Sequence, residues 1–437
     1  MIVSQAFKGK TYAVLGLARS GLATVDTLVA SGARVVAWDS REEARAAVAD
    51  KAELGDPMEI DLAGFDGIVV SPGVPLNKHP IAMRAKIAGV PIIGDIELFA
   101  LARPTLPPHK VVGITGTNGK STTTALIHHI IEQAGFPARM GGNIGLPILG
   151  QEPLEPNLHG VGVYVLELSS YQIDLTHSLD CDVAVLLNIT PDHLDRYNGF
   201  AGYVASKARL FAMQSADHVA VIATEDEPSR GIAASAPAQL REVKAADIDP
   251  EAQLGWPSLQ GPHNAQNAAV AIAVGRALDI DDATIMAALA SYASLPHRMQ
   301  AVGTHNGVLY VNDSKATNAA STAPALGAWP ARDGKPRIHW ILGGVAKSDN
   351  LDECAPYYGN IAHAYTIGEA GHMFADLLRP HMAVDDSEML SAAVRRAARI
   401  AQPGDVVLLS PACASFDQFR DFEARGDAFA AAVNALE

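Results

Sequence analysis

Residues 110–135 read KVVGITGTNGKSTTTALIHHIIEQAG, and this stretch decides the fold in the middle of the chain. A β-branched run enters the glycine-rich segment GTNGKST, and an amphipathic pattern follows it as far as Gly135. This order predicts a strand, a phosphate-binding loop and a helix, because glycines let backbone N–H groups approach phosphate oxygens at a helix N-terminus. Lys120 adds a cation, and Ser121 or Thr122 can ligate magnesium.

The loop departs from the strict Walker pattern at one place, because Ile114 stands where that pattern has glycine. An ordinary helix start with a glycine turn is therefore the alternative. The strand before the loop and the Lys-Ser-Thr run after it favour nucleotide binding. A phosphate-binding loop does not by itself identify a reaction, since motors, switches, kinases and ligases all use one.

The rest of the chain repeats the alternation of short apolar runs and amphipathic stretches. That order predicts βαβ units with parallel sheets covered by helices. A chain of 437 residues exceeds the usual size of one core, so two or three domains are expected. The proline-rich segment 102–110 is typical of a linker, and a second break falls at 296–299, before the strand-like run GVLYVND. We predict three α/β domains, at residues 1–105, 106–298 and 299–437.

Composition narrows the choice of partners and compartment. The net charge of -15 argues against binding to nucleic acid or to an anionic membrane surface, which both require a positive field. The three cysteines are scattered without a CxxC pair, so neither a disulfide framework nor a cysteine zinc site is indicated. No signal-peptide pattern opens the chain, and no apolar run approaches the roughly 20 residues of a membrane span. We expect a cytoplasmic monomer with no membrane insertion.

Two further segments place polar residues at the ends of predicted strands. In VYVLELSSYQ, Glu167 lies near the C-terminal end of a strand, where ligands gather in open α/β sheets. It is either a magnesium ligand or an ordinary strand-end glutamate. In DVAVLLNITPDHLDRY, a buried strand runs into a loop with Asp192, His193 and Asp195. Because this loop shares the strand-end rim, we expect His193 to meet metal or substrate.

The beginning of the chain imitates a dinucleotide-binding fingerprint. In VLGLARSG, the three positions of GxGxxG hold Gly16, Ala18 and Gly21, and Asp39 follows 23 residues after Gly16. A fingerprint of this kind is weak, and Ala18 weakens it further. An NAD-dependent oxidoreductase therefore remains an alternative with little support.

Nine motifs in order carry a family resemblance. They are TGTNGKST, GGNIG, ELSSYQ, NITPDHLDRY with Lys207 after it, GPHNAQN, LPHR, NDSKATN, LGG with Lys347, and LSPACASFDQF. With these motifs the chain resembles the Mur ligase family over all three predicted domains, and most closely its D-glutamate-adding members. The arginine signature DNPR of the diaminopimelate- or lysine-adding members is absent.

The resemblance implies both fold and activity. It implies a Rossmann-like N-terminal domain for a UDP-sugar, a central P-loop mononucleotide-binding domain for ATP, and a Rossmann-like C-terminal domain for an amino acid. The implied reaction joins D-glutamate to UDP-N-acetylmuramoyl-L-alanine through an acyl phosphate, releasing ADP and phosphate, in peptidoglycan precursor synthesis. Another Mur-type ligase, a folylpolyglutamate-type ligase or a non-catalytic nucleotide switch are the alternatives.

The resemblance also implies roles for individual residues around ATP. The residues implied to contact ATP are Gly116, Thr117, Asn118, Gly119, Lys120, Ser121, Thr122, Asn264, Asn267, Arg298, Asp313 and Lys315. Two magnesium ions are implied, with the ligand set Ser121, Glu167, His193 and Lys207. The residues implied to be catalytic are Lys120, Glu167, His193, Lys207, Arg298 and Lys315. Without the resemblance, the asparagines would be read as a helix cap.

Lys207 matches a family lysine that is carbamylated. Only a neutral amine adds carbon dioxide, and a nearby metal stabilises the anion that forms. The modification would turn a cation into a carboxylate-like metal bridge. On its residues alone, Lys207 in YVASKARLFAM would be an ordinary solvated helix lysine.

The remaining implied residues bind the two other substrates. The residues implied to bind the UDP-sugar are Arg19, Ser20, Asp39, Ser40, Arg41, Ser71, Pro72, Gly73, Asn143 and His193. The residues implied to bind D-glutamate are Thr317, Lys347, Ser415, Phe416 and Phe422. Local structure offers other readings: SPG can be a strand-exit turn, Thr317 or Asn318 can cap a helix, and Ser415 with Gln418 has the spacing of a capping box.

Two positions of the amino-acid pocket depart from the family pattern. Val345 and Ala346 precede Lys347 where relatives commonly have Asp-Gly, and Phe416 stands where Leu is usual.

Overall fold

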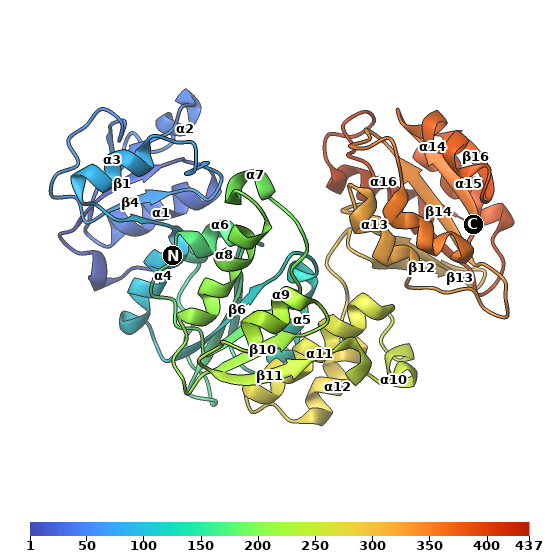
Figure 1. The fold of residues 1–437 in the computed structure, drawn as a ribbon, viewed down its shortest axis with the longest axis horizontal. Helices are drawn as coiled ribbons and strands as arrows, with labels where there is room; N and C mark the ends of the chain where they lie inside the picture. The colour runs from blue at the N-terminus through green and yellow to red at the C-terminus, as the bar shows by residue number, and fades with distance from the viewer. Residues whose placement is uncertain (437) are drawn as a thin grey trace. The chain divides into compact units, whose positions relative to one another are not determined.

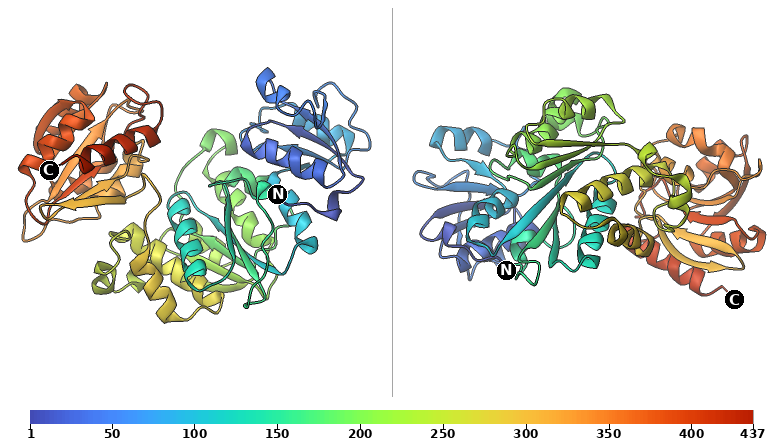
Figure 2. Two further views of the ribbon diagram at one scale, coloured as in Figure 1. Left: turned by 180° about the vertical axis from the view of Figure 1, so that it is seen from behind. Right: turned by 90° about the horizontal axis from the view of Figure 1, so that it is seen from below.

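The computed structural model describes residues 1–436 as a mixed α/β fold with three sheets, which follow one another along the chain from blue to red in Figures 1 and 2. The residues form two compact units, one of Met1–Lys244 with Ala269–Met286 and one of Ala245–Ala268 with Ala287 onward. The domain boundaries after residues 105 and 298 stay predictions. No helix within residues 1–436 has the length and apolar character needed to cross a membrane.

The first sheet has the strand order β3-β2-β1-β4-β5, and all its pairs are parallel. Its strands are β1 (Thr11–Leu15), β2 (Arg34–Trp38), β3 (Glu53–Leu54), β4 (Gly67–Val70) and β5 (Ile92–Ile93). The helices are α1 (Arg19–Ala30), α2 (Glu42–Ala46), α3 (Ile81–Ala88) and α4 (Asp95–Ala102). The central strands are continuous apolar runs because helices bury both of their faces.

The second sheet has the order β11-β10-β9-β6-β8-β7 and is also parallel. Its strands are β6 (His109–Thr115), β7 (Ala138–Gly142), β8 (Gly162–Glu167), β9 (Val183–Leu186), β10 (Val219–Ala223) and β11 (Gln239–Val243). The helices that follow in this part of the chain are α5 (Lys120–Gln133), α6 (Ser170–Asp174), α7 (Leu194–Tyr197), α8 (Phe200–Ala212), α9 (Glu227–Ala233), α10 (Pro250–Leu254), α11 (Pro262–Ala277) and α12 (Asp282–Ser291). The strand order reverses at β6, and ligands of such sheets bind beyond the carboxyl ends of strands at that point.

The third sheet has the order β12-β13-β17-β14-β15-β16. Its strands are β12 (Gln300–His305), β13 (Val308–Asn312), β14 (Ile338–Gly343), β15 (Ile361–Ile367), β16 (Ala383–Glu388) and β17 (Val406–Leu409). Its helices are α13 (Ala319–Leu326), α14 (Gly371–Leu378), α15 (Leu390–Ile400) and α16 (Phe422–Asn434). Five short 3₁₀ segments complete the described elements: Gln5–Phe7, Arg103–Thr105, Ile148–Gly150, Ala245–Asp247 and Asp352–Asn360.

One edge of the third sheet departs from the expected parallel pattern. Strands β12 and β13 pair antiparallel, and only Asn306 and Gly307 join them. Both residues have positive φ, at 50° and 76°. An Asn-Gly pair suits this two-residue hairpin because both of its positions need the left-handed region. The strand-like run GVLYVND predicted β13, whereas β12 and this hairpin were not predicted from the sequence.

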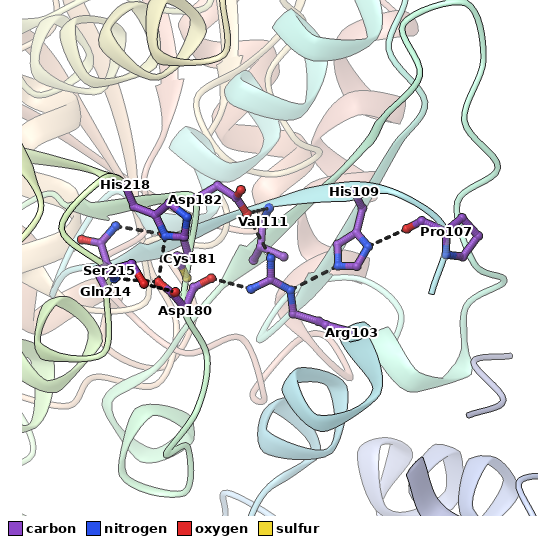
Figure 3. Close-up of polar contacts among 10 residues, drawn as sticks. All are labelled: Arg103, Pro107, His109, Val111, Asp180, Cys181, Asp182, Gln214, Ser215 and His218. Atoms are coloured by element: carbon purple, nitrogen blue, oxygen red, sulfur yellow. Dashed lines mark hydrogen bonds and ion pairs between the residues drawn. The ribbon is translucent and has the colours of Figure 1, made fainter. Parts of the chain in front are cut away.

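The predicted linker between the first and second sheets is fixed in place, as Figure 3 shows. Arg103 donates a hydrogen bond to the backbone oxygen of Asp180, and its Nη2 lies 3.0 Å from Asp182 Oδ2. Its Nε lies 3.1 Å from His109 Nε2. Asp182 Oδ2 also accepts from the Val111 N–H at 2.8 Å. Arg103 thus ties the linker to the start of β6 and to the residues before β9.

We predict that Arg103→Ala lowers the free energy of unfolding by about 1–3 kcal/mol, since it leaves a half-buried carboxylate without its charged partner. Urea unfolding of the full chain measures this change. The matched control is Arg34→Ala, which removes an exposed pair with Glu53 and should change stability little. Equal losses in the two variants would contradict the assigned role of Arg103.

Candidate active site

The phosphate-binding loop, residues 116–122, connects β6 to α5 through two glycines that the backbone requires. Gly116 has φ of 154°, and a Cβ there would lie 2.9 Å from Leu187 Cβ. Gly119 has φ of 84° and directly precedes the first residue of α5. A side chain would strain either position. The loop backbone can therefore lie against a phosphate at the N-terminus of this 14-residue helix.

Asn188, which comes soon after β9, holds the phosphate-binding loop from the neighbouring strand end. Its backbone oxygen accepts from Thr117 N at 2.9 Å, and its Oδ1 accepts from Asn118 N at 2.8 Å. Its Nδ2 donates to Asn118 O at 3.2 Å. Asn188 was not predicted as a site residue from the sequence. The available signal was a polar side chain beyond a buried strand on the predicted ligand-binding edge.

Two lysines converge on the same loop. Lys120 Nζ donates to Gly116 O at 2.9 Å and to Thr117 O at 2.8 Å. Lys207, on α8, is 1% exposed, and its Nζ also donates to Gly116 O at 2.9 Å. Burial, and then the charge of Lys120, lower the pKa of Lys207 to about 7. A substantial share of this amine is therefore neutral near pH 7, which is the form that adds carbon dioxide. Lys207 is not the solvated lysine that its segment alone allowed.

Glu167 ends β8 beside the phosphate-binding loop and is 2% exposed. Its Oε1 accepts from Asn143 Nδ2 at 2.8 Å, whereas its buried Oε2 has no hydrogen-bond partner among residues 1–436. The backbone at Gly142 packs so closely that a Cβ would lie 2.2 Å from Glu167 O. Because a buried carboxylate oxygen is costly without a partner, Oε2 is suited to a cation ligand.

His193 lies at the rim, just before α7, with its backbone in the left-handed region. Its ring centroid is 4.9 Å from that of Tyr171, and its Nε2 is 3.5 Å from Asp192 Oδ2. About half of the side chain is exposed, so a substrate can reach it. The predicted position of His193 beside the phosphate-binding loop thus matches the fold, and its ligand remains a prediction.

A cleft of about 340 Å³ joins these residues to the loop after β4. Its lining residues are Pro72, Gly73, Lys120, Asn143, Ser169, Ser170, Tyr171, Asp192, His193, Tyr203 and Lys207. The volume lies in the range of small-molecule sites. The cleft brings together residues predicted to bind the UDP-sugar, the ATP phosphates and magnesium.

The first sheet presents the predicted UDP-sugar residues at the carboxyl ends of β1, β2 and β4. Gly16 has φ of 92°, and Ser71 Oγ donates to Gly16 O at 2.8 Å. Gly21 packs so tightly that a Cβ would lie 2.0 Å from the same oxygen. Arg19 and Ser20 occupy the first two positions of the 12-residue helix α1. An anionic group can bind there, close to Ser71.

Asp39 shapes this loop from the end of β2. Its Oδ2 accepts from Leu17 N at 2.7 Å, and its Oδ1 accepts from Arg41 N at 3.0 Å. Burial raises its pKa, but the hydrogen bonds from Arg41 and Leu17 outweigh this effect and lower the pKa to about 2. Asp39 is therefore ionised at neutral pH and holds Arg41 beside Ser40. A uracil contact by these three residues remains a prediction.

In the second unit, the two asparagines of GPHNAQN share one face of α11. They are 3% and 4% exposed, and Asn267 Nδ2 donates to Asn264 Oδ1 at 3.1 Å. Asn264 Nδ2 donates to Gln260 O at 3.1 Å. These contacts lie within the helix and its approach, so they are compatible with both the capping and the adenine-binding interpretations.

Asp313 is the most strongly constrained residue of the NDSKATN motif. Its Oδ2 accepts from Ser410 Oγ at 2.8 Å, and its Oδ1 accepts from Met299 N at 3.2 Å. Burial raises its pKa to about 7, while Ser410, Met299 and the charge of Arg298 oppose that rise. Arg298 and Asp313 thus lie near each other, as their shared prediction as nucleotide residues requires.

Thr317 and Asn318 have separate roles. Asn318 is the N-cap of α13, with Oδ1 accepting from Ser321 N at 2.8 Å. Thr317 Oγ1 lies 3.4 Å from Lys347 Nζ, so two predicted D-glutamate residues meet. Lys315 Nζ lies 4.0 Å from the ring centroid of Phe422, which belongs to the same predicted pocket.

The predicted capping box at Ser415 is wrong. No helix begins there, and the N–H groups of Gln418 and Phe419 instead donate to Ser415 O in a turn. Helix α16 begins at Phe422 with Asp421 as its N-cap. Ser415 is 2% exposed, whereas Phe416 is 74% exposed, and a contact of either residue with D-glutamate stays a prediction.

The donors next to the cleft of the first unit fit a magnesium ion, since Asn143 lines the cleft and donates to Glu167 beside it. Within residues 1–436, no three His, Cys, Asp or Glu side chains gather in a metal-binding group. Magnesium needs fewer protein ligands, because it is often held by one or two carboxylates together with substrate phosphates and waters. Glu167 supplies the unpartnered oxygen, and Ser121 belongs to the part of the phosphate-binding loop that forms the first turn of α5. The donors present suit an ion that arrives with a nucleotide.

Family comparisons agree with this geometry. The MurD-like N-terminal domain of Mur ligases matches residues 10–94, the Mur ligase middle domain matches 114–256, and the glutamate ligase domain of Mur ligases matches 297–413. A UDP-N-acetylmuramoylalanine–D-glutamate ligase of Novosphingobium aromaticivorans is 66% identical, over 100% of this chain and 97% of that protein. The chain belongs to the Mur ligase family. Enzymes of the same name from Sphingopyxis alaskensis and Zymomonas mobilis are 64% and 58% identical to this Mur ligase over the full length of both chains.

Solved structures share the fold of this Mur ligase at low identity. MurF from Acinetobacter baumannii matches with a TM-score of 0.58 and 16% identity, over 98% of this chain and 93% of that one. MurF from Thermotoga maritima, solved in complex with ADP, matches with a TM-score of 0.58 and 15% identity, over 99% and 97%. These matches support the three-domain α/β fold.

We predict that Asp313 makes the stability of this Mur ligase pH-dependent. The folded-state pKa of about 7 lies above the ordinary value of an aspartate, so folded protein holds this proton more tightly than unfolded protein does. The resulting stabilisation is complete below about pH 4 and is lost as pH rises through 7. Compared with Asp313→Asn, the wild type should lose stability between about pH 4 and about pH 7 in urea unfolding. Parallel pH profiles for the two proteins would contradict this.

Proposed function

We propose that this Mur ligase joins D-glutamate to UDP-N-acetylmuramoyl-L-alanine, consuming ATP and releasing ADP and phosphate, in peptidoglycan synthesis. The observation that carries the proposal is full-length identity of 58–66% to enzymes named for that reaction. The geometry supports it independently, because Lys120 of the phosphate-binding loop and the buried Lys207 line one cleft, and Asn143, which also lines it, donates to the buried Glu167 carboxylate.

The chemistry explains why cations gather at this site. A carboxylate is a poor electrophile, so phosphoryl transfer from ATP must first convert the donor's carboxylate into an acyl phosphate. Lys120 and the N–H groups of the phosphate-binding loop would hold the phosphates, and Arg298 and Lys315 are proposed to act on the same nucleotide. These groups would stabilise the negative charge that develops during transfer. The neutral amine of D-glutamate then attacks the carbonyl carbon, and the C–O bond to phosphate breaks.

Magnesium and the carbamate belong to this proposal. When bound, magnesium would neutralise phosphate charge, held by Ser121 and Glu167 at one site and by carbamylated Lys207 near His193 at a second. The buried Lys207 amine supports carbamylation, because its pKa of about 7 leaves a neutral fraction that can react. We propose His193 as a group that stabilises charge and orients the donor.

We assign the outer loops to the other two substrates. The Gly16 loop with Arg19, Ser20 and Ser71 would hold the donor's diphosphate, which is an anion placed at a helix N-terminus. Lys347 and Thr317, which lie 3.4 Å apart at Nζ and Oγ1, would bind a carboxylate of D-glutamate. We further propose a cytoplasmic location, since both nucleotide substrates are water-soluble, and the expected monomer stays a prediction.

A test of acceptor specificity decides between this function and its neighbours. Purified protein with ATP, magnesium and UDP-N-acetylmuramoyl-L-alanine should release phosphate with D-glutamate, and not with L-glutamate, L-lysine or diaminopimelate. Omitting the UDP-sugar provides the control for uncoupled ATP hydrolysis. Preference for another acceptor would reassign the chain to a different ligase, and phosphate release independent of both substrates would indicate a nucleotide switch.

We predict that Lys207→Ala lowers kcat by roughly 100-fold or more, because it removes the carbamate and its charge from the reacting phosphates. Short-chain carboxylates such as acetate should restore part of the activity by occupying the vacated space, whereas bicarbonate should not. The exposed lysine variant Lys86→Ala serves as the matched control with unchanged rates. Full activity in Lys207→Ala would remove the carbamate from the account.

A further inference from the structure

Arg425 is an unusual charge in the second unit because it is only 1% exposed and has no carboxylate within ion-pair distance among residues 1–436. It projects from the first turns of α16. Burial lowers its pKa to about 10, so the guanidinium remains protonated at neutral pH. Burying a cation without an ion-pair partner lowers the stability of the folded protein. We therefore expect the contacts of Arg425 with the surrounding loops to provide the benefit that offsets this cost.

The guanidinium holds the loop that carries Lys315. Arg425 Nε donates to Ser314 Oγ at 3.0 Å, and Nη2 donates to Ser314 O at 2.9 Å. Ser314 Oγ in turn donates to Phe422 O at 2.8 Å, which closes a ring between this loop and the first turn of α16. Lys315, the next residue, lies over the Phe422 ring.

The same side chain borders two other loops at this edge of the third sheet. Its Nη1 lies 3.5 Å from Gly343 O. A Cβ at Gly344 would lie 3.2 Å from Nη1 and 2.2 Å from Ala414 O. Val345 and Ala414 exchange both backbone hydrogen bonds at 2.9 Å, so the turn before Lys347 is bound to the segment before Ser415. Arg425 therefore contacts or borders all three loops that carry Lys315, Lys347 and Ser415.

We propose that Arg425 is a positioning residue for the acceptor amino acid, holding the three loops in register and placing a permanent positive charge behind the acceptor's carboxylates. This inference rests on the proposed function, because it assumes that Lys347 and Ser415 bind D-glutamate. Arginine suits the role better than lysine, since its planar fork reaches Ser314 at two atoms and Gly343 at a third. Asp417 acts on Arg425 only as a nearby charge and not as an ion-pair partner, so the acceptor dicarboxylate would add to the negative charge that the guanidinium faces.

Steady-state kinetics on the full chain test the inference, with Arg425→Met removing the charge and Arg425→Lys keeping the charge without the fork. The KM for D-glutamate should rise roughly tenfold or more in Arg425→Met and by less in Arg425→Lys. The KM for the UDP-sugar should stay within about twofold, because the loops that Arg425 contacts are not the proposed donor loops. Ser314→Ala, which keeps the arginine, should raise the KM for D-glutamate modestly.

Arg399→Met is the matched control, since it removes the same charge from an exposed position on α15 and should leave all constants unchanged. Circular dichroism and urea unfolding identify variants that fail to fold. If Arg425→Met fails to fold, the KM values for D-glutamate of Arg425→Lys and Ser314→Ala test the inference. An unchanged KM for D-glutamate in the folded variants overturns the inference, as does an equal rise in the KM for the UDP-sugar. A wild type that does not use D-glutamate overturns the proposed function instead.

Discussion

The side-chain nitrogens of two lysines donate to one carbonyl oxygen, Gly116 O, and the chemistry of the site depends on how this concentration of positive charge is relieved. Both Lys120 and Lys207 lie 2.9 Å from this oxygen, and Lys207 is almost fully buried. Two like charges this close in a poorly solvated place favour the neutral form of one of them, or the arrival of anions. Nucleotide phosphates and a carbamate both provide that relief. The same electrostatic constraint therefore links nucleotide binding to the proposed chemical modification of Lys207.

Sheet topology places the polar residues that surround this carbonyl oxygen. Because β6 lies between β8 and β9, the phosphate-binding loop, Glu167 and Asn188 all leave the sheet at one edge. The third sheet repeats this arrangement, with the loops after β13, β14 and β17 meeting around Arg425. In both units, a cation is placed where several backbone carbonyls converge. A charge held this way is ready for an anionic substrate without reorganisation of the loops.

Local patterns in the sequence predicted the parallel α/β units and the phosphate-binding loop, because glycine positions and strand-loop-helix order are short-range features. The Asn306-Gly307 hairpin was equally local and was overlooked. Asn188 had a local signal as a polar residue beyond a buried strand, but its partner in the phosphate-binding loop, 70 residues away, could not be read from local patterns, and neither could the partner of Arg425, 111 residues away. The predicted capping box at Ser415 is wrong for another reason. Ser415 and Gln418 have the spacing of a capping box, but Asp421 is the N-cap at which α16 begins. Side-chain spacing alone does not decide between two competing helix starts.

Carbon-13 NMR of the full chain in labelled bicarbonate tests the central claim most directly, because it observes the modified lysine without relying on activity. The account predicts a labelled carbamate resonance in the wild type that strengthens as pH rises through about 7, where the Lys207 amine loses its proton. The resonance should be absent from Lys207→Arg. An active wild-type enzyme with no such resonance under saturating bicarbonate would contradict the account.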